Sequence, residues 1–495
     1  MRARTREEVT SAGDVRWFTR ALDRLEALPN DHDPALAGFL APGEPLFVAR
    51  APGRLDVMGG IADYSGSLVL ELPLACATFA VAQRQSAPRL EVVSLRAGRP
   101  HWFAMDLEPL LAGALRAPEA LAEWFAERGA DIEGGGDRWA AYVVGVVHRC
   151  LTLAGPDAVA RRGLRLLIES DVPEGKGVSS SAALEVACMA AAAAAYDVEL
   201  SASETAAACQ WAENHIARAP CGIMDQMTVA CGRRDHLLRL RCQPATVEGH
   251  VRVPPGYHFY GMDSGIRHAV TGADYGTVRT AAFMGYRLIA DAAGLAARAD
   301  GTRVHVEDVR WRGYLANITP AELAERFEER LPSRMLGADF LARYGGITDA
   351  VTRVDPERWY PVRQATVHPV HEQARVARFA ELLGGGLEHS GAAGEMGTLM
   401  HASHASYGAC GLGSEGTDRL VDLVAAAGPS HGLFGAKITG GGSGGTVAVF
   451  GTEGARAVVY DIARQYEREM GRSVAVFDGS GPGAEETGVL VLDSP

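Results

Sequence analysis

The chain has 495 residues, 47% of them hydrophobic, and a formal net charge of −13. A chain of this length and apolar content can bury a large core and is expected to form two domains or three. The negative charge argues against nucleic acid or an acidic membrane surface as a partner. Local N–H groups, a few cations and a metal would therefore have to hold any anionic ligand.

The cysteines and the N-terminus indicate the compartment. The eight cysteines are scattered and none belongs to a Cys-x-x-Cys pair, which is typical of reduced thiols in a cytoplasm. The N-terminus opens with charged residues, no apolar signal region follows, and no charge-free apolar run is long enough to span a membrane. We therefore expect a cytoplasmic protein without a membrane partner.

Helix and strand patterns alternate in the first third of the chain. Residues 1–42 carry amphipathic helical signals, and residues 45–50 predict a strand. Residues 68–83 are apolar and β-branched enough for one or two strands, and residues 109–153 are helical in pattern. None of these segments indicates a particular chemistry.

Residues 51–66 read Ala-Pro-Gly-Arg-Leu-Asp-Val-Met-Gly-Gly-Ile-Ala-Asp-Tyr-Ser-Gly. Several glycines here lie close to Arg54, Asp56 and Asp63, a mixture that a core strand does not need. We therefore expect a loop after the strand at 45–50. It is either a surface loop with a structural Arg–Asp pair or part of a functional site.

A candidate phosphate-binding loop lies at residues 173–187, Pro-Glu-Gly-Lys-Gly-Val-Ser-Ser-Ser-Ala-Ala-Leu-Glu-Val-Ala. The apolar run 164–169 before it predicts a strand, and the Ala-rich run 182–195 after it predicts a helix. Gly175 and Gly177 would let the backbone turn sharply and approach a ligand, while the serines supply hydroxyls and N–H groups at the helix start, which favours an anion. In the alternative, the glycines only form a turn and the serines only cap the helix.

A second candidate is a carboxylate in apolar surroundings. Residues 203–218 predict a helix that carries Glu213, and another helical turn begins in the string Cys-Gly-Ile-Met-Asp-Gln-Met, which contains Asp225. A carboxylate among apolar side chains is costly unless it is paired. Asp225 is therefore either a structural ion-pair partner or a functional acid or base.

The composition shifts at residues 254–256, and residues 257–263 predict a new strand. We place the domain boundary there, which gives an N-terminal domain at 1–255 and a C-terminal domain at 256–495. Helical patterns fill much of the second domain up to residue 430.

Two histidine pairs in this helical region, His368 with His371 and His401 with His404, have the i,i+3 spacing of some metal ligands. No acidic or cysteine ligand accompanies them at a recognised spacing, which disfavours a metal site there.

A glycine loop at residues 439–445 lies between two predicted strands, 433–438 and 446–450. The loop formally satisfies Gly-x-Gly-x-x-Gly, but that motif binds dinucleotides only where it opens a helix, and the segment after this loop is strand-like. No Walker A motif is present either.

Three of these stretches occur in the order found in one enzyme family. The chain resembles the GHMP kinases, named after galactokinase, homoserine kinase, mevalonate kinase and phosphomevalonate kinase, at residues 51–66, 173–187 and 437–445. The galactokinase branch fits best, because the strings Ala-Glu-Asn-His at 212–215, Pro-Cys-Gly-Ile-Met-Asp-Gln at 220–226 and Asp-Ser-Gly-Ile-Arg-His at 263–268 are similar to its internal blocks. The resemblance covers roughly residues 45–290 and 390–450 and leaves 300–360 unassigned.

The resemblance implies an α/β fold of two domains with the active site in the cleft between them, ATP and Mg²⁺ as co-substrates, and transfer of the γ-phosphoryl group to the anomeric hydroxyl of a sugar. It also implies roles for residues of this chain. Asp225 would be the catalytic base and Arg54 would stabilise charge beside it, while Ser181 and Glu213 would hold Mg²⁺. The phosphates would be bound by Gly175, Lys176, Gly177, Val178, Ser179, Ser180 and Ser181, with Gly440, Gly441 and Gly442 closing on them. The sugar would contact Asp63, Gly222, Asp225 and Tyr275.

One departure from the galactokinase pattern bears on the sugar. Galactokinases have Glu-His where this chain has Gly60-Ile61, and those two polar residues face the C6 hydroxymethyl group of galactose. L-arabinopyranose lacks that group, so Gly60 and Ile61 suit the pentose, and the string Gly-Gly-Ile-Ala-Asp-Tyr-Ser-Gly is similar to that of L-arabinokinases. The sequence therefore predicts an L-arabinose 1-kinase. A galacturonate kinase would need a cation near C6, which Gly60 and Ile61 do not offer.

Two alternatives stay open. The first is a galactokinase with an altered C6 pocket. The second is a sensor that binds sugar and ATP on the same fold without turnover, against which Asp225, Arg54 and the three loop serines argue. The oligomeric state, monomer or dimer, is not indicated by the sequence.

Overall fold

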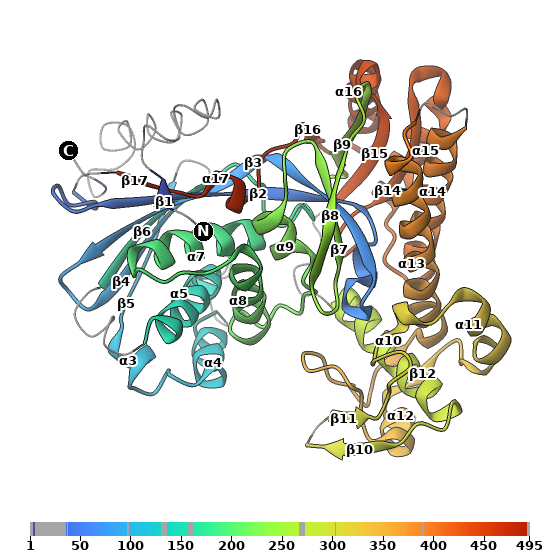
Figure 1. Ribbon diagram of the computed structural model, residues 1–495, viewed down its shortest axis with the longest axis horizontal. Coiled ribbons are helices and arrows are strands. Elements are labelled where there is room, and N and C mark those ends of the chain that lie inside the picture. The colour runs from blue at the N-terminus through green and yellow to red at the C-terminus, as the bar shows by residue number, and fades with distance from the viewer. Residues whose placement is uncertain are drawn as a thin grey trace.

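The computed structural model describes residues 3–4, 36, 38–96, 99–129, 136–155, 163–266, 273–301, 303–387 and 391–492 (Figure 1). Most of the helix expected within residues 1–42 lies outside the described residues. The fold is a mixture of helices and strands, as the α/β prediction required.

The larger sheet has nine strands among the described residues, in the spatial order β1-β17-β2-β3-β6-β4-β5, with β7 paired to β3 and β8 paired to β7. Most neighbours are antiparallel; β1 with β17 and β4 with β6 are parallel. The strands are β1 (Ala3–Arg4), β2 (Leu46–Met58), β3 (Leu68–Gln85), β4 (Arg89–Arg96), β5 (Arg99–Asp106), β6 (Gly163–Ser170), β7 (His236–Arg241), β8 (Thr246–Arg252) and β17 (Val489–Leu492).

Helices cover one face of this sheet and form the main core with it (Figure 1). The Ala-rich helix α7 (Ser180–Ala195) packs on β2 and β3, and its small side chains allow that close approach. The other elements of this layer are α3 (Glu108–Leu111), α4 (Pro118–Gly129), η3 (Gly136–Trp139), α5 (Ala140–Ala154), α8 (Ala202–His215) and α9 (Met224–Cys231). The predicted strand–loop–helix order around residues 173–187 is confirmed by β6 and α7.

The expectation of a loop from residue 51 is wrong, because β2 continues to Met58 and the short 3-10 helix η2 (Gly60–Ser65) follows it. The pairing of β2 with β3 shifts register between Pro52 and Arg54, which lets the strand accept a proline and a glycine. Arg54 and Asp56 are two residues apart in a strand and therefore face the same side of the sheet. Ion pairs with Asp225 and Lys437 compensate the cost of burying their charges.

The smaller sheet has the antiparallel order β14-β15-β9-β16. Its strands are β9 (Tyr257–Asp263), β14 (Leu433–Ile438), β15 (Thr446–Thr452) and β16 (Val476–Asp478). The first three agree with the strands predicted at 257–263, 433–438 and 446–450, whereas β16 was not predicted. The helical elements beside it are α13 (Val362–Gly384), α14 (Ala392–Ala409), α15 (Glu415–Ala427), η6 (Pro429–His431), η7 (Glu453–Ala455) and α16 (Arg456–Met470).

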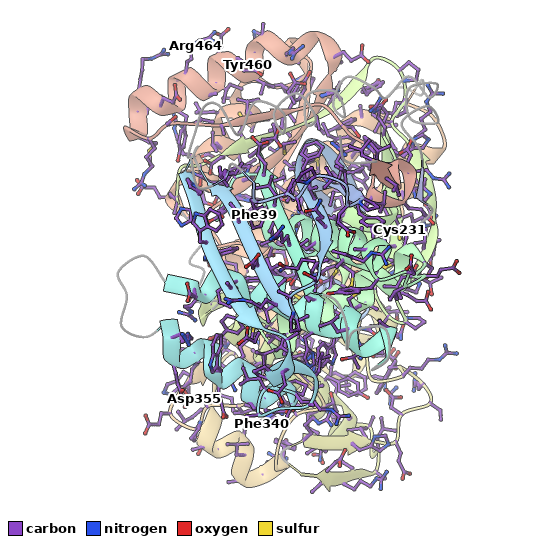
Figure 2. All side chains as sticks on the ribbon, turned by 90° about the vertical axis from the view of Figure 1, so that its left-hand side faces the viewer. Phe39, Cys231, Phe340, Asp355, Tyr460 and Arg464 are labelled. Carbon is purple, nitrogen blue, oxygen red and sulfur yellow. The ribbon has the colours of Figure 1, made fainter. Side chains whose placement is uncertain are left out.

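The segment that could not be placed from the sequence, residues 300–360, belongs to a small lobe built on α10 (Ala273–Ala292) (Figure 1). In Figure 2, Phe340 and Asp355 of this lobe lie at the opposite end of the molecule from Tyr460 and Arg464 of α16. A hydrophobic cluster joins the lobe to η2, α10, α13 and α14. The lobe contains β10 (Ala297–Asp300), β11 (Arg303–Val306), η4 (Leu315–Asn317), α11 (Pro320–Arg326), η5 (Glu328–Arg330), β12 (Met335–Leu336), α12 (Gly337–Tyr344) and β13 (Trp359–Tyr360).

The C-terminal segment returns to the larger sheet, where β17 pairs antiparallel with β2 after the short helix α17 (Ala484–Thr487). The division into 1–255 and 256–495 stays a prediction, but these last residues pack on β2, α7 and α9, which belong to the first predicted domain. No helix in the described ranges combines the length and the apolar character needed to cross a bilayer.

Candidate active site

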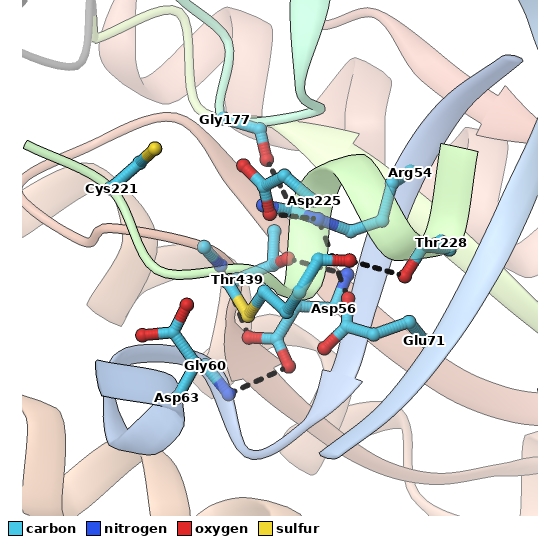
Figure 3. A network of polar contacts seen from close by, with 12 residues as sticks. Arg54, Asp56, Gly60, Asp63, Glu71, Gly177, Cys221, Asp225, Thr228 and Thr439 are labelled. Atoms are coloured by element: carbon cyan, nitrogen blue, oxygen red, sulfur yellow. Dashed lines mark hydrogen bonds and ion pairs between the residues drawn. The ribbon is translucent and has the colours of Figure 1, made fainter. Parts of the chain in front are cut away.

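The centre of the candidate site is an ion pair between Arg54 of β2 and Asp225 of α9 (Figure 3). Arg54 Nε donates to Asp225 Oδ1 over 2.9 Å, and Nη1 donates to the carbonyl oxygen of Gly177 over 3.0 Å. Arg54 is only 2% exposed, whereas the Asp225 side chain is 22% exposed. The cation is therefore fixed inside the protein while its carboxylate partner can still reach a ligand.

The charge of Arg54 is secured by its surroundings. Burial by itself would lower the pKa of Arg54, but Asp225, Glu71 and Asp56 outweigh it and raise the pKa above its usual value. Glu71 Oε2 lies 3.4 Å from Arg54 Nε. Burial and the charge of Asp56 raise the pKa of Glu71 far above its usual value.

The candidate phosphate loop runs from β6 to the start of α7. Gly175 and Gly177 have φ values of +69° and +73°, in the left-handed region that favours glycine. Ser179 precedes the helix but makes no side-chain cap hydrogen bond, and its buried Oγ has no partner. A helix-capping role therefore does not explain why a serine occupies position 179. An unpartnered hydroxyl beside free N–H groups at a helix N-terminus fits a bound phosphate.

Lys176 in the same loop is paired with the second half of the molecule. Its Nζ lies 2.6 Å from Asp263 Oδ2 at the end of β9, and its carbonyl oxygen accepts a hydrogen bond of 2.7 Å from Thr446 Oγ1 of β15. The loop is thus tied to the smaller sheet at Lys176, and phosphate binding by its ammonium group would compete with Asp263.

The glycine loop between β14 and β15 lies against the phosphate loop. A Cβ atom added to Gly440 would be 3.2 Å from the carbonyl oxygen of Gly177 and 3.3 Å from Arg54 Nη1, so the third predicted motif meets the first two here. Gly440 and Gly442 have positive φ values, and an added Cβ at Gly442 would collide with Leu412 at 2.7 Å. Gly441 lies between them in the loop.

The predicted metal ligands, Ser181 of α7 and Glu213 of α8, lie within hydrogen-bond reach of one another. Glu213 Oε2 also accepts a hydrogen bond of 2.6 Å from Gln226 Nε2, which contacts Glu185 Oε2 at 3.2 Å. Burial and the charge of Asp225 raise the pKa of Glu213 to about 7. A buried carboxyl group next to a hydroxyl fits a cation.

No group of three or more His, Cys, Asp or Glu side chains within the described part of the chain forms a metal site. This agrees with the way Mg²⁺ is commonly bound beside a nucleotide, where one or two protein ligands are completed by phosphates and water. The histidines of the two i,i+3 pairs lie in α13 and α14, where His368 contacts Ser406 and His404 contacts Asp418.

Of the predicted sugar contacts, Asp63 lies near Asp225, and Gly222 and Tyr275 lie near Asp63. A Cβ atom added to Gly222 would lie 1.5 Å from Asp63 Oδ2, so this position has to be glycine for the carboxylate to stay there. Tyr275 meets Tyr64 edge-on, with ring centroids 5.7 Å apart. Burial, and then the charge of Asp225, raise the pKa of Asp63 to about 7.

The pKa of Asp63 predicts how stability depends on pH. Because its folded value of about 7 exceeds the usual 3.8, Asp63 lowers the free energy of unfolding progressively as pH rises from about 4 to 7. We expect Asp63→Asn to raise that free energy by about 1–3 kcal/mol more at pH 8 than at pH 5, measured by urea denaturation. A difference between variant and wild type that does not change with pH would contradict this assignment.

Two further residues on this side were not found from the sequence. Arg279 of α10 makes a bidentate ion pair with Asp349 of the small lobe, at 2.8 and 2.9 Å, and donates to the carbonyl oxygen of Cys221 over 2.9 Å. The lobe therefore holds the backbone in place at Cys221, directly before Gly222. No local pattern marks Asp349, because its partner lies 70 residues away.

Gly60 and Ile61 are enclosed by residues that sequence reasoning also missed. Gly60 has a φ value of +46°, and a Cβ atom there would be 1.5 Å from Tyr407 Oη. The Ile61 side chain is 1% exposed and belongs to the hydrophobic cluster of the small lobe. Below them, Asp56 and Lys437 form a fully buried ion pair of 2.7 Å.

Two segments of the chain match the domains of a known enzyme family. Residues 141–233 match the model of the N-terminal domain of GHMP kinases, and residues 382–468 match that of their C-terminal domain. An L-arabinokinase of Arabidopsis thaliana is 38% identical over an alignment of 544 positions, which covers 98% of this chain and 51% of the relative. The chain thus spans about half the length of that relative.

Galactokinases are also similar to the chain. That of Chloroflexus aurantiacus is 29% identical over 432 positions, covering 87% of this chain and 90% of the relative. The crystal structure of Lactococcus lactis galactokinase complexed with galactose superimposes with a TM-score of 0.69 at 19% identity, covering 93% of this chain and 98% of that one. At this identity the superposition shows the fold alone.

Proposed function

We propose that this chain, whose residues 141–233 and 382–468 match the N-terminal and C-terminal domains of GHMP kinases, is an ATP-dependent sugar 1-kinase acting on L-arabinose. The product would be L-arabinose 1-phosphate. The observation that carries the proposal is the Arg54–Asp225 pair, which touches the phosphate loop at Gly177 and lies beside the glycine loop at Gly440.

Phosphoryl transfer needs in-line positioning and neutralisation of negative charge more than covalent chemistry. ATP bound with Mg²⁺ would supply the γ-phosphoryl group. The N–H groups at the start of α7 would hold phosphate oxygens, and Ser181 and Glu213 would hold the metal. Asp225 would accept or position the proton of the anomeric hydroxyl, while Arg54 keeps that carboxylate in place and stabilises charge on the transferred group.

The preference for L-arabinose is supported by the surroundings of Gly60. Position 60 has no room for a side chain, and the one hydroxyl next to it, Tyr407 Oη, already accepts a hydrogen bond from Ile61 and donates one to Gly440. A C6 hydroxyl group near this turn would therefore lack the partners that Glu and His provide in galactokinases. The 38% identity to an L-arabinokinase, against 29% to galactokinases, agrees with this choice.

An ADP-release assay coupled to NADH oxidation, run with L-arabinose, D-galactose and D-galacturonate, tests the proposal. We expect turnover that depends on Mg²⁺ and is fastest with L-arabinose. Turnover fastest with D-galactose would favour the galactokinase alternative. Binding of a sugar by calorimetry without turnover of any sugar would favour the sensor.

Gly177→Val tests the phosphate loop. Valine at a φ of +73° is strained, and the same peptide carries the carbonyl group that holds Arg54. We expect the KM for ATP to rise on the order of 10-fold or more and the Kd for the sugar to change much less, measured by kinetics and calorimetry. Equal losses of both affinities together with a lower melting temperature would instead support a purely structural loop.

A further inference from the structure

We infer that Tyr407 is a positioning residue that fastens the η2 turn to the glycine loop and thereby makes binding of the sugar and of the nucleotide cooperative. The inference rests on the proposed function, since it takes η2 (60–65) as part of the sugar site and 440–442 as part of the nucleotide site. Tyr407 lies on α14, outside the three motifs of the family resemblance.

The hydroxyl group of Tyr407 bridges the backbones of the two loops. Its Oη accepts a hydrogen bond of 2.8 Å from the N–H of Ile61 and donates one of 3.0 Å to the carbonyl oxygen of Gly440. Tyr407 is 0% exposed, so water cannot replace either contact. Two buried backbone groups that lie 379 positions apart in the sequence thus share one hydroxyl group for their hydrogen bonds.

Asp56 makes a second bridge between the same loops. Its Oδ1 accepts from the N–H of Gly60 at 3.1 Å, and its Oδ2 accepts from the N–H of Gly440 at 3.1 Å. Lys437, also fully buried, neutralises this carboxylate at 2.7 Å. Burial would raise the pKa of Asp56, but Lys437 and Arg54 lower it below its usual value, so the bridge stays charged.

Gly60 is the counterpart of Tyr407 in this arrangement. Because an added Cβ atom would overlap Tyr407 Oη at 1.5 Å and approach Asp56 Oδ2 at 2.7 Å, the bridge requires glycine at position 60. Tyrosine at position 407 therefore requires glycine at position 60. The ring is held by His368, whose centroid lies 5.2 Å away edge-on.

Such a bridge couples the two sites energetically. A sugar that orders η2 also orders the bridge, so the glycine loop loses less conformational freedom when the nucleotide follows. The strength of this effect is the factor α by which one ligand raises the affinity for the other, and linkage requires the same α in both directions. Values of about 5–150 are typical of coupled sites.

The experiment measures α by calorimetry, titrating L-arabinose into the full chain with and without saturating ADP and Mg²⁺, and ADP with and without L-arabinose. We expect α of about 5 or more in the wild type. Tyr407→Phe keeps the ring and removes only the bridging hydroxyl group, so α should fall below the wild-type value while the Asp56 bridge remains. The matched control is Tyr260→Phe, which removes another buried tyrosine hydrogen bond, 3.0 Å to the carbonyl oxygen of Thr452, and should leave α unchanged.

The outcomes separate this inference from the proposed function. A wild type that binds both ligands with α equal to 1 overturns the inference and leaves the proposed function standing, and this result needs no variant. An α that is unchanged in Tyr407→Phe, or lowered equally in Tyr260→Phe, overturns it as well. A wild type that binds neither ligand overturns both.

Discussion

Asp225→Asn is expected to lower kcat by on the order of 10²-fold or more while ATP still binds. Asparagine keeps the size of the side chain and can still accept a hydrogen bond from Arg54, but it can neither take up the proton of the anomeric hydroxyl nor balance the charge of the buried guanidinium group. Steady-state kinetics with saturating L-arabinose measure kcat, and calorimetry with ADP and Mg²⁺ measures nucleotide binding.

The matched control for this variant is Asp197→Asn. Asp197 also pairs with an arginine, Arg84, but at 3.4 Å and with its side chain 78% exposed. Exposed ion pairs of this kind contribute little, so kcat should stay within a factor of about two of the wild type. Near-normal turnover of Asp225→Asn would remove Asp225 from the mechanism and leave the Arg54 pair as a structural contact.

Local sequence patterns predicted the strands and the helix that frame the site but misjudged β2. The strands β9, β14 and β15 and the Ala-rich helix α7 are mostly apolar, so their patterns are visible in the sequence. In β2 the proline, glycine, arginine and aspartate at 52–56 hide the strand. The strand tolerates these residues because its pairing with β3 shifts register at the proline. In addition, partners distant in the sequence form ion pairs with the arginine and the aspartate.

The candidate site shows the same limit. Arg54, Asp225 and the two glycine-containing loops could be found because each lies in a short motif with its own chemistry. Tyr407 could not, because it is an ordinary residue in a helix pattern whose role depends on a contact 346 positions away, to Ile61. Lys437 begins the third motif, but the sequence does not show that it pairs with Asp56, 381 positions away. Only the assembled fold shows that Gly60 lacks a side chain because a tyrosine fills its place.

The wild type is expected to prefer L-arabinose to D-galactose by about 5- to 150-fold in kcat/KM. Galactose would place its C6 hydroxyl group near positions 60 and 61, where glycine and isoleucine offer no polar side chain, and an unsatisfied buried hydroxyl costs about 1–3 kcal/mol. Both sugars in competition with one limiting pool of ATP give the ratio directly. As the control, Asp63→Ala should lower kcat/KM for both sugars by similar factors, because the contacts proposed for Asp63 are to ring hydroxyls that both sugars share. A faster reaction with galactose would contradict the assignment.

Reversing this preference requires three changes. Gly60→Glu with Ile61→His would restore the galactokinase pair, but the new side chain at 60 would overlap Tyr407 Oη, so this double variant is expected to lose activity with both sugars. Adding Tyr407→Ala makes room for it.

Tyr407→Ala alone is the control, since its loss of the bridge affects both sugars and cancels in their ratio. The triple variant should shift the ratio towards galactose by about 5-fold or more relative to that control. If the ratio does not move, positions 60 and 61 do not distinguish the sugars at C6.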